Sequence, residues 1–190
     1  MVFSLDAYSP PIASLLAKAP HNELGPGRPD SGQVAELAKL SPETLVAPRA
    51  LVDREMAQAC LAGLWLRFDE LDRSHEISQS LSSATGSYWH GIMHRREPDY
   101  GNAKYWFHRV GKHPIFGPLA EASRALAAAT EAGKAAEQLI AAADWDPFEF
   151  VDLCQLAARG KEPLTQFCRQ IQEREWELLF DYCYARAIGR

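Results

Sequence analysis

The chain has 190 residues, of which 47% are hydrophobic and 24% are charged, and its formal net charge is −5 at pH 7. This length suits one domain with a hydrophobic core, and the composition excludes a wholly disordered chain. The negative net charge argues against a nucleic-acid-binding protein, because binding to phosphate backbones requires a basic surface. No apolar run approaches the roughly 18 residues of a membrane-spanning helix, so no membrane partner is predicted.

The N-terminus does not have the pattern of a secretory signal. Met1–Asp6 lacks a basic residue, and Pro10 and Pro11 follow before any long apolar stretch. The four cysteines show no Cys-x-x-Cys spacing, which predicts reduced thiols buried in helices. They are Cys60, Cys154, Cys168 and Cys183. We therefore expect a cytoplasmic protein.

Residues 1–30 contain five prolines and two glycines, which are incompatible with a long helix. They predict an extended N-terminal arm, followed by a single helical domain over residues 31–190. The first predicted helix of this domain is Ser31–Leu40. Ser41 followed by Pro42 then predicts an N-cap and the first position of another short helix.

The next predicted helix, Asp53–Leu81, is the longest and is expected to cross the domain. It contains no proline, and its apolar residues recur at helical spacing. Two shorter helices should follow, Ser87–Glu97 and Asn102–Val110. Thr85 or Ser87 is expected to cap the first of them, and a glycine follows the second.

The C-terminal part also favours helices. In residues 120–143, 12 of the 24 residues are alanine, which predicts a helical hairpin with a bend at Gly133. Pro147–Arg159 and Pro163–Ile188 are the last predicted helices. Strand patterns are nearly absent. The predicted fold class is all-α, an irregular bundle of about seven to eight helices around one long central helix, with a proline-rich N-terminal arm.

Five of the six histidines lie between residues 65 and 113. His90 and His94 are four residues apart, so a helix places both imidazoles on one face, as a pair of metal ligands requires. His75, Asp72 or Glu97 would be the third ligand, and Glu97 is the weakest of them because a proline follows it. Such a set suits one divalent ion, either zinc, iron or manganese.

Asp72 and His75 lie three residues apart, where the apolar face of the predicted long helix continues as polar residues. With His90 and His94 they form the candidate catalytic set, as metal ligands or as acid and base groups. Three alternatives remain open at this stage. The histidines line a pocket that holds no metal, or Asp72 and His75 are a hydrogen-bonded pair inside the protein, or the helix emerges into solvent at these two residues.

Basic and aromatic residues alternate between Tyr88 and Pro114, where five Lys and Arg residues against two acidic ones give a local charge of +3. Guanidinium groups suit a carboxylate or phosphate, and flat rings suit a sugar-like body. The predicted ligand-binding residues are Arg95, Arg96, Lys104, Arg109, Tyr88 and Trp89, and the predicted partner is a small anionic molecule. The alternative is that the rings pack in the core and the cations are solvated.

Residues 86–114, which begin Gly-Ser-Tyr-Trp-His-Gly and end Gly-Lys-His-Pro, resemble the central block of an uncharacterised family of soil-bacterial and fungal proteins. Residues 71–79 resemble the segment just before that block. The resemblance covers roughly a quarter of the chain. Because no activity is established for that family, the resemblance implies a functional segment and brings no catalytic residues with it.

The sequence thus favours an enzyme or a small-molecule-binding protein. Its pocket would be lined by His, Asp and Arg side chains and would take an anionic or sugar-like ligand, with or without a metal. The alternative is a non-catalytic helical domain that binds other proteins and uses its histidines as structural residues. The sequence does not decide whether the protein is an enzyme.

Overall fold

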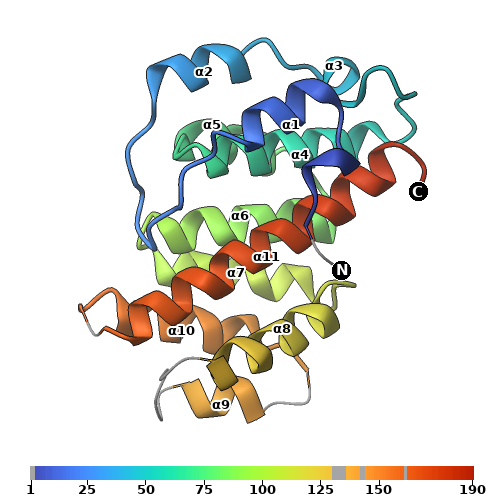
Figure 1. Ribbon diagram of the computed structural model, residues 1–190. Coiled ribbons are helices and arrows are strands. Elements are labelled where there is room, and N and C mark those ends of the chain that lie inside the picture. The colour runs from blue at the N-terminus through green and yellow to red at the C-terminus, as the bar shows by residue number, and fades with distance from the viewer. Residues whose placement is uncertain (1–2, 130–135, 142–143, 161) are drawn as a thin grey trace.

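The computed structural model describes residues 3–129, 136–141, 144–160 and 162–190. These residues form eleven α-helices and no strand (Figure 1). The predicted all-α class is therefore confirmed, although there are more helices than expected. Gly133, the expected bend, lies outside the described residues. Within the described part, no helix is both long enough and apolar enough to cross a membrane.

A short 3₁₀ turn at Leu5–Ala7 precedes the helices. The helices are α1 (Pro10–Leu16), α2 (Ser31–Leu37), α3 (Pro42–Val46), α4 (Arg54–Arg67), α5 (Leu71–Ser78), α6 (Ala84–Arg96), α7 (Tyr100–Val110), α8 (Phe116–Ala129), α9 (Glu137–Ala141), α10 (Pro147–Ala157) and α11 (Leu164–Ala187).

Side-chain caps explain where several helices begin. Ser41 accepts a hydrogen bond from the backbone N–H of Thr44, and Pro42 occupies the first turn, as predicted. Ser83, rather than Thr85 or Ser87, caps α6 by accepting from the backbone N–H of Gly86. The helix therefore begins three residues earlier than the sequence suggested.

The predicted helix Asp53–Leu81 is wrong, because the chain turns between α4 and α5. Asp69 adopts a φ of 64°, which ends the helical path. Its carboxylate accepts hydrogen bonds from Asn22 Nδ2 at 2.8 Å and from the backbone N–H of Arg28 at 3.1 Å, and it pairs with Arg96. These tertiary bonds hold Asp69 out of the helix. The longest helix among the described residues is instead α11, with 24 residues.

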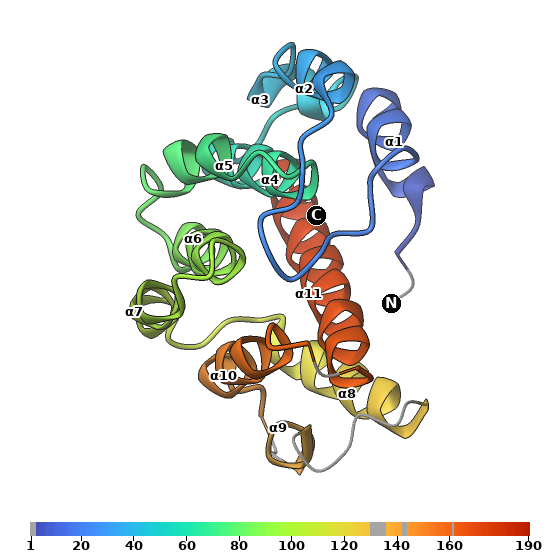
Figure 2. The same cartoon turned by 90° about the vertical axis from the view of Figure 1, so that its left-hand side faces the viewer.

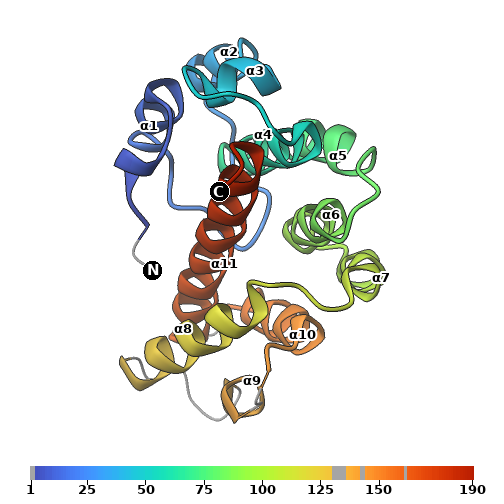
Figure 3. The same cartoon turned by 90° about the vertical axis from the view of Figure 1, so that its right-hand side faces the viewer.

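Helix α11 crosses the whole molecule, and α4, α8 and α10 pack against it (Figure 1). Viewed from the side, α4, α6, α7 and α10 form an arc along α11 (Figures 2 and 3). Helix α5 packs on α4 and α6, and α6 packs on α7. Gly63 permits the close contact of α4 with α6, because a Cβ atom there would lie 2.7 Å from the Trp89 ring.

The N-terminal residues contribute to the core, in addition to covering it. Tyr8, Ile12 and Leu24 are buried, and the Tyr8 ring packs edge-on against Phe180 and Tyr184 of α11. The four cysteines are also buried and form no disulfide, as predicted.

Candidate metal centre

Three histidines from two helices meet where α5 packs on α6. His75 lies on α5, and His90 and His94 lie one turn apart on α6. Each offers a ring nitrogen, and these nitrogens all lie within 4.8 Å of one another. The chain turn at Asp69 brings α5 back against α6, so a histidine distant in sequence from the His90–His94 pair joins it in space.

His90 is the central residue of this cluster. Its side chain is 2% exposed, and neither ring nitrogen has a hydrogen-bond partner among the described residues. The ring stacks on Trp106, with centroids 3.8 Å apart, and contacts His75 edge-on at 4.6 Å. A buried imidazole with two unpaired nitrogens is costly unless something else binds it.

His94 is oriented by neighbouring polar residues. Its Nδ1 lies 3.0 Å from Glu97 Oε2, so the Nδ1–H donates to this carboxylate. Its Nε2 then carries the lone pair, which accepts from Asn102 Nδ2 at 3.1 Å, so a metal ion bound at Nε2 would displace this amide. Carboxylates that hold the distal nitrogen of a metal-binding histidine in this manner are common in metal proteins.

Burial keeps His90 and His94 neutral. Burial, and then the proximity of His94 and His75, lowers the pKa of His90 from 6.5 to about 3. Burial also lowers the pKa of His94, although Glu97 opposes this effect. His90 and His94 are therefore uncharged at neutral pH, which is the protonation state that a metal ion requires of an imidazole.

The arrangement can hold a divalent transition-metal ion. Zinc binds imidazole nitrogen at about 2.0–2.1 Å, which places tetrahedral ligands roughly 3.3 Å apart, so small side-chain shifts would complete the site. Three imidazoles without a carboxylate favour zinc, copper, iron or nickel over manganese. Three protein ligands leave at least one coordination position open for water or a ligand.

The chain matches no known protein-family model, and comparison with curated proteins and with solved structures found no similar protein. The resemblance of residues 71–79 and 86–114 to a family of soil-bacterial and fungal proteins therefore stays a prediction.

Asp72 does not join the histidines, contrary to the predicted set. It is exposed and lies outside the group of converging ligand atoms. It occupies the first turn of α5, where a carboxylate is stabilised by the helix N-terminus without a buried partner. The two-histidine, one-carboxylate arrangement is therefore replaced by three histidines.

Arg95 and Arg96 were predicted to bind an anionic ligand, but the structure gives each of them an acidic partner inside the protein. Both are 1% exposed. Arg95 Nη2 lies 2.5 Å from Glu175, and Arg96 Nη2 lies 2.5 Å from Asp69. These carboxylates compensate the two charges inside the protein, although Nε and Nη1 of Arg95 have no hydrogen-bond partner among the described residues.

The remaining predicted ligand-binding residues have different positions. Tyr88 and Trp89 are fully buried and belong to the core. Lys104 forms an ion pair with Asp152 at 2.6 Å. Arg109 is exposed, and its guanidinium lies 5.3 Å from the Trp106 ring centroid, next to the stack on His90. Arg109 is therefore the predicted cation that contacts the Trp106 ring stacked on His90.

Sequence reasoning missed the positions of Asn102 and Trp106 beside the cluster, and it weighed Glu97 only as a metal ligand and not as the hydrogen-bond partner of His94. Asn102 stands eight residues after His94, and Trp106 sixteen after His90. Their spacing carries no signal, because the two residues reach the histidines only through the packing of α7 on α6.

Proposed function

We propose that this protein binds one divalent transition-metal ion, with zinc as the best match, through His75, His90 and His94. The open coordination position would bind water or a small anion. Such a centre favours reactions in which metal-bound water attacks an electrophile, as in hydrolysis or hydration. Two unpaired nitrogens on the buried ring of His90 carry the proposal.

The position of Arg109 supports an anionic ligand for the same centre. Three neutral imidazoles leave the metal's positive charge uncompensated, and Arg109 adds a second cation on the Trp106 side. An anion at the open position would meet both charges. The alternative of purely structural histidines gains no support from His90, whose nitrogens bond to no described group.

Metal analysis of the purified protein tests the proposal. We expect one zinc per chain, and titration of chelator-treated protein with Zn²⁺ should restore it. His75→Ala and His90→Ala should each abolish stoichiometric binding. His108→Ala is the matched control, because His108 is an exposed histidine on α7. Far-UV circular dichroism would confirm that each variant keeps its helices.

Cobalt substitution tests the open position. Co²⁺ bound to three imidazoles and water should give visible absorption bands that change when azide is added. The proposed site would be contradicted if wild-type protein supplied with excess Zn²⁺ binds none. It would also be contradicted if His108→Ala loses as much bound zinc as His75→Ala and His90→Ala. A cobalt spectrum unaffected by azide would contradict the open position only.

A further inference from the structure

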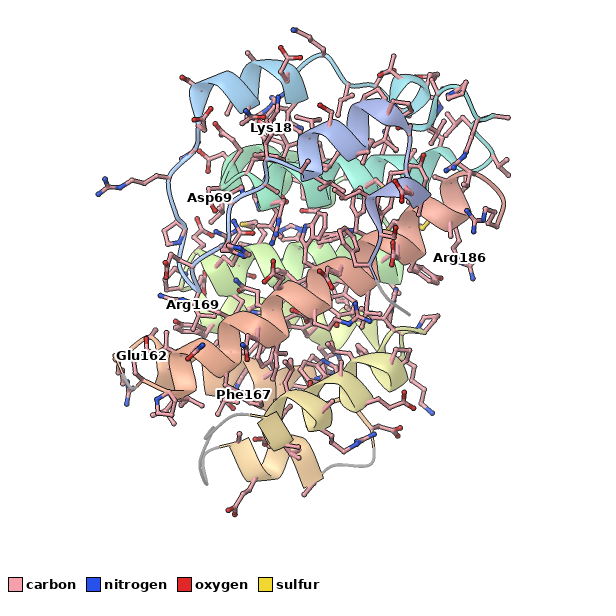
Figure 4. The ribbon with its side chains drawn as sticks, in the orientation of Figure 1. Lys18, Asp69, Glu162, Phe167, Arg169 and Arg186 are labelled. Atoms are coloured by element: carbon pink, nitrogen blue, oxygen red, sulfur yellow. The ribbon has the colours of Figure 1, made fainter. Side chains whose placement is uncertain are left out.

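Helix α7 brings an uncharged hydrogen-bond donor to the three histidines. His75 reaches them because the chain turns at Asp69, which is labelled in Figure 4, and Asn102 reaches them because α7 packs on α6. Asn102 Nδ2 lies 3.1 Å from Nε2 and 3.4 Å from Nδ1 of His94. The Asn102 side chain is partly buried and has no other hydrogen-bond partner among the described residues. Its amide is therefore a member of this cluster.

A metal ion in the cluster would remove the acceptor that Asn102 uses. Nδ1 of His94 carries the proton that Glu97 accepts, so Nε2 has the one lone pair of this ring. The same lone pair would bind the ion. The N–H groups of the Asn102 amide would then lie beside the metal without a partner, which is costly for a partly buried donor. A ligand of the metal can become the new acceptor.

The distances bring such a ligand within reach of the amide. Zinc would lie about 2.0–2.1 Å from His94 Nε2, and Asn102 Nδ2 lies 3.1 Å from that nitrogen. The amide nitrogen is therefore no more than about 5 Å from the ion. A metal–oxygen bond of about 2.0–2.2 Å and a hydrogen bond of about 2.9 Å together span that distance. Asn102 can thus donate to an oxygen atom of a metal-bound anion.

The chemistry of the site favours a donor role for the amide over a role as fourth metal ligand. Carbonyl oxygens suit magnesium, calcium and manganese, whereas the three imidazoles suit zinc, copper, iron or nickel. A hydrogen bond from the amide to an ionised oxygen is stronger than one to a neutral acceptor. The Glu97 carboxylate on the other side of His94 disfavours a doubly charged anion. These features select a singly charged oxyanion.

We propose that Asn102 is a specificity-determining residue of the metal centre and that it selects a small carboxylate. One carboxylate oxygen would bind the ion at the open position, and the other would accept from Asn102 Nδ2. The inference rests on the proposed metal function and names the class of its ligand. A single-atom anion such as bromide has no second atom to accept from the amide, so it would gain less from Asn102.

Cobalt-substituted protein tests the proposal, because its visible bands report anion binding. Formate is the carboxylate probe, and bromide is the single-atom comparison. Asn102→Leu removes both donors at similar size, and it leaves the cap of α7 in place because Asp99 bonds to the backbone N–H of Asn102. We expect formate affinity to fall about tenfold in this variant, whereas bromide affinity should change less than about threefold. His108→Ala, at an exposed position of α7, should bind formate like the wild type.

Zinc titration of the same variant separates this inference from the metal proposal. Asn102→Leu should bind Zn²⁺ as tightly as the wild type or up to about tenfold more tightly, because the amide no longer competes for His94. The inference is overturned if formate affinity is unchanged in this variant, or if bromide affinity falls as much. It is also overturned if the variant loses zinc affinity, since the amide would then be a metal ligand. If wild-type protein binds neither Zn²⁺ nor Co²⁺, the metal proposal itself fails, which is seen before any anion is added.

Discussion

His90 and His113 are both buried, but they differ in their hydrogen bonding. His113 Nε2 lies 3.2 Å from Thr85 Oγ1, and its Nδ1 accepts from the backbone N–H of Ile115 at 3.4 Å. Both of its nitrogens are satisfied, so it is a structural residue. His90 is buried to a similar degree, yet it has no such partner. Burial alone therefore does not separate a ligand from a core histidine, whereas the hydrogen bonds do.

Glu97 should raise metal affinity without contacting the metal. Glu97→Gln weakens the charge that orients His94, and such changes typically cost about 10–100-fold in affinity. Because the Glu97 side chain is 53% exposed, we expect the lower end, about tenfold, in a competitive zinc titration.

Glu76→Gln is the control for this measurement, since Glu76 lies on α5 in an exposed pair with Arg73. Zinc affinity should be unchanged in that variant. If Glu97→Gln also binds zinc as tightly as the wild type, the bond between His94 and Glu97 has no role in the metal centre.

The sequence predicted part of this cluster because helical geometry is local. A spacing of four residues is enough to place His90 and His94 on one face. Arg95 and Arg96 show where this reasoning ends, because their partners Glu175 and Asp69 lie 80 and 27 residues away. Spacing along the chain cannot distinguish an arginine without an acidic partner from one that already forms an ion pair within the protein.

At the scale of elements, the turn at Asp69 determines which residues reach the metal centre. The apolar periodicity of residues 53–81 was consistent with one helix, and aspartate is not a strong helix breaker. The break depends on Asn22, Arg28 and Arg96, which bond to the Asp69 carboxylate. A tertiary interaction therefore overrides a local preference, and it directs His75 toward α6 while Asp72 stays in solvent.

The buried pair of Arg95 and Glu175 ties α6 to α11. Both side chains are 0% exposed, so removing one leaves the other charged and unpaired. Arg95→Met should lower the free energy of unfolding by about 3–5 kcal/mol in urea titrations. The double variant with Glu175→Met should recover much of this loss, because no buried charge remains.

An exposed ion pair is the comparison for these substitutions of the buried pair. Arg73→Met breaks the pair with Glu76, whose side chains are more than half exposed, and should change stability by less than about 1 kcal/mol. If the double variant loses the sum of the unfolding free energies lost in Arg95→Met and Glu175→Met, the two side chains do not stabilise each other.

For the whole molecule, buried neutral histidines predict acid sensitivity. Burial, and then the charge of Arg186, lowers the pKa of His113 to about 4. The unfolded chain takes up a proton near pH 6.5, whereas the folded chain does so only near pH 4. Stability from His113 is therefore fully present above pH 6.5 and is lost as the pH falls toward 4. His90 adds a loss in the same direction that continues to about pH 3.

His113→Gln isolates this effect, since glutamine does not titrate and can keep polar contacts. With EDTA present to exclude metal binding, wild-type stability should fall between pH 6 and 4.5 more steeply than that of the variant. The difference should be about 1.4 kcal/mol per pH unit, which corresponds to one proton. If the free energy of unfolding falls with pH equally in the wild type and the variant, His113 has the same pKa in the folded and unfolded chains.

The manner in which residues 25 and 26 are attached has a consequence for sequence change. Arg96 donates to the backbone carbonyls of Gly25 and Pro26, so the anchor recognises main-chain atoms and no side chain of that segment. A Cβ at Gly25 would meet no atom within 4 Å, whereas one at Gly27 would collide with Asp69 at 2.2 Å. The side chains at residues 25 and 26 can therefore change as long as the segment keeps its length. Insertions or deletions in this segment should be selected against more strongly than substitutions. Gly27 is the exception to that freedom.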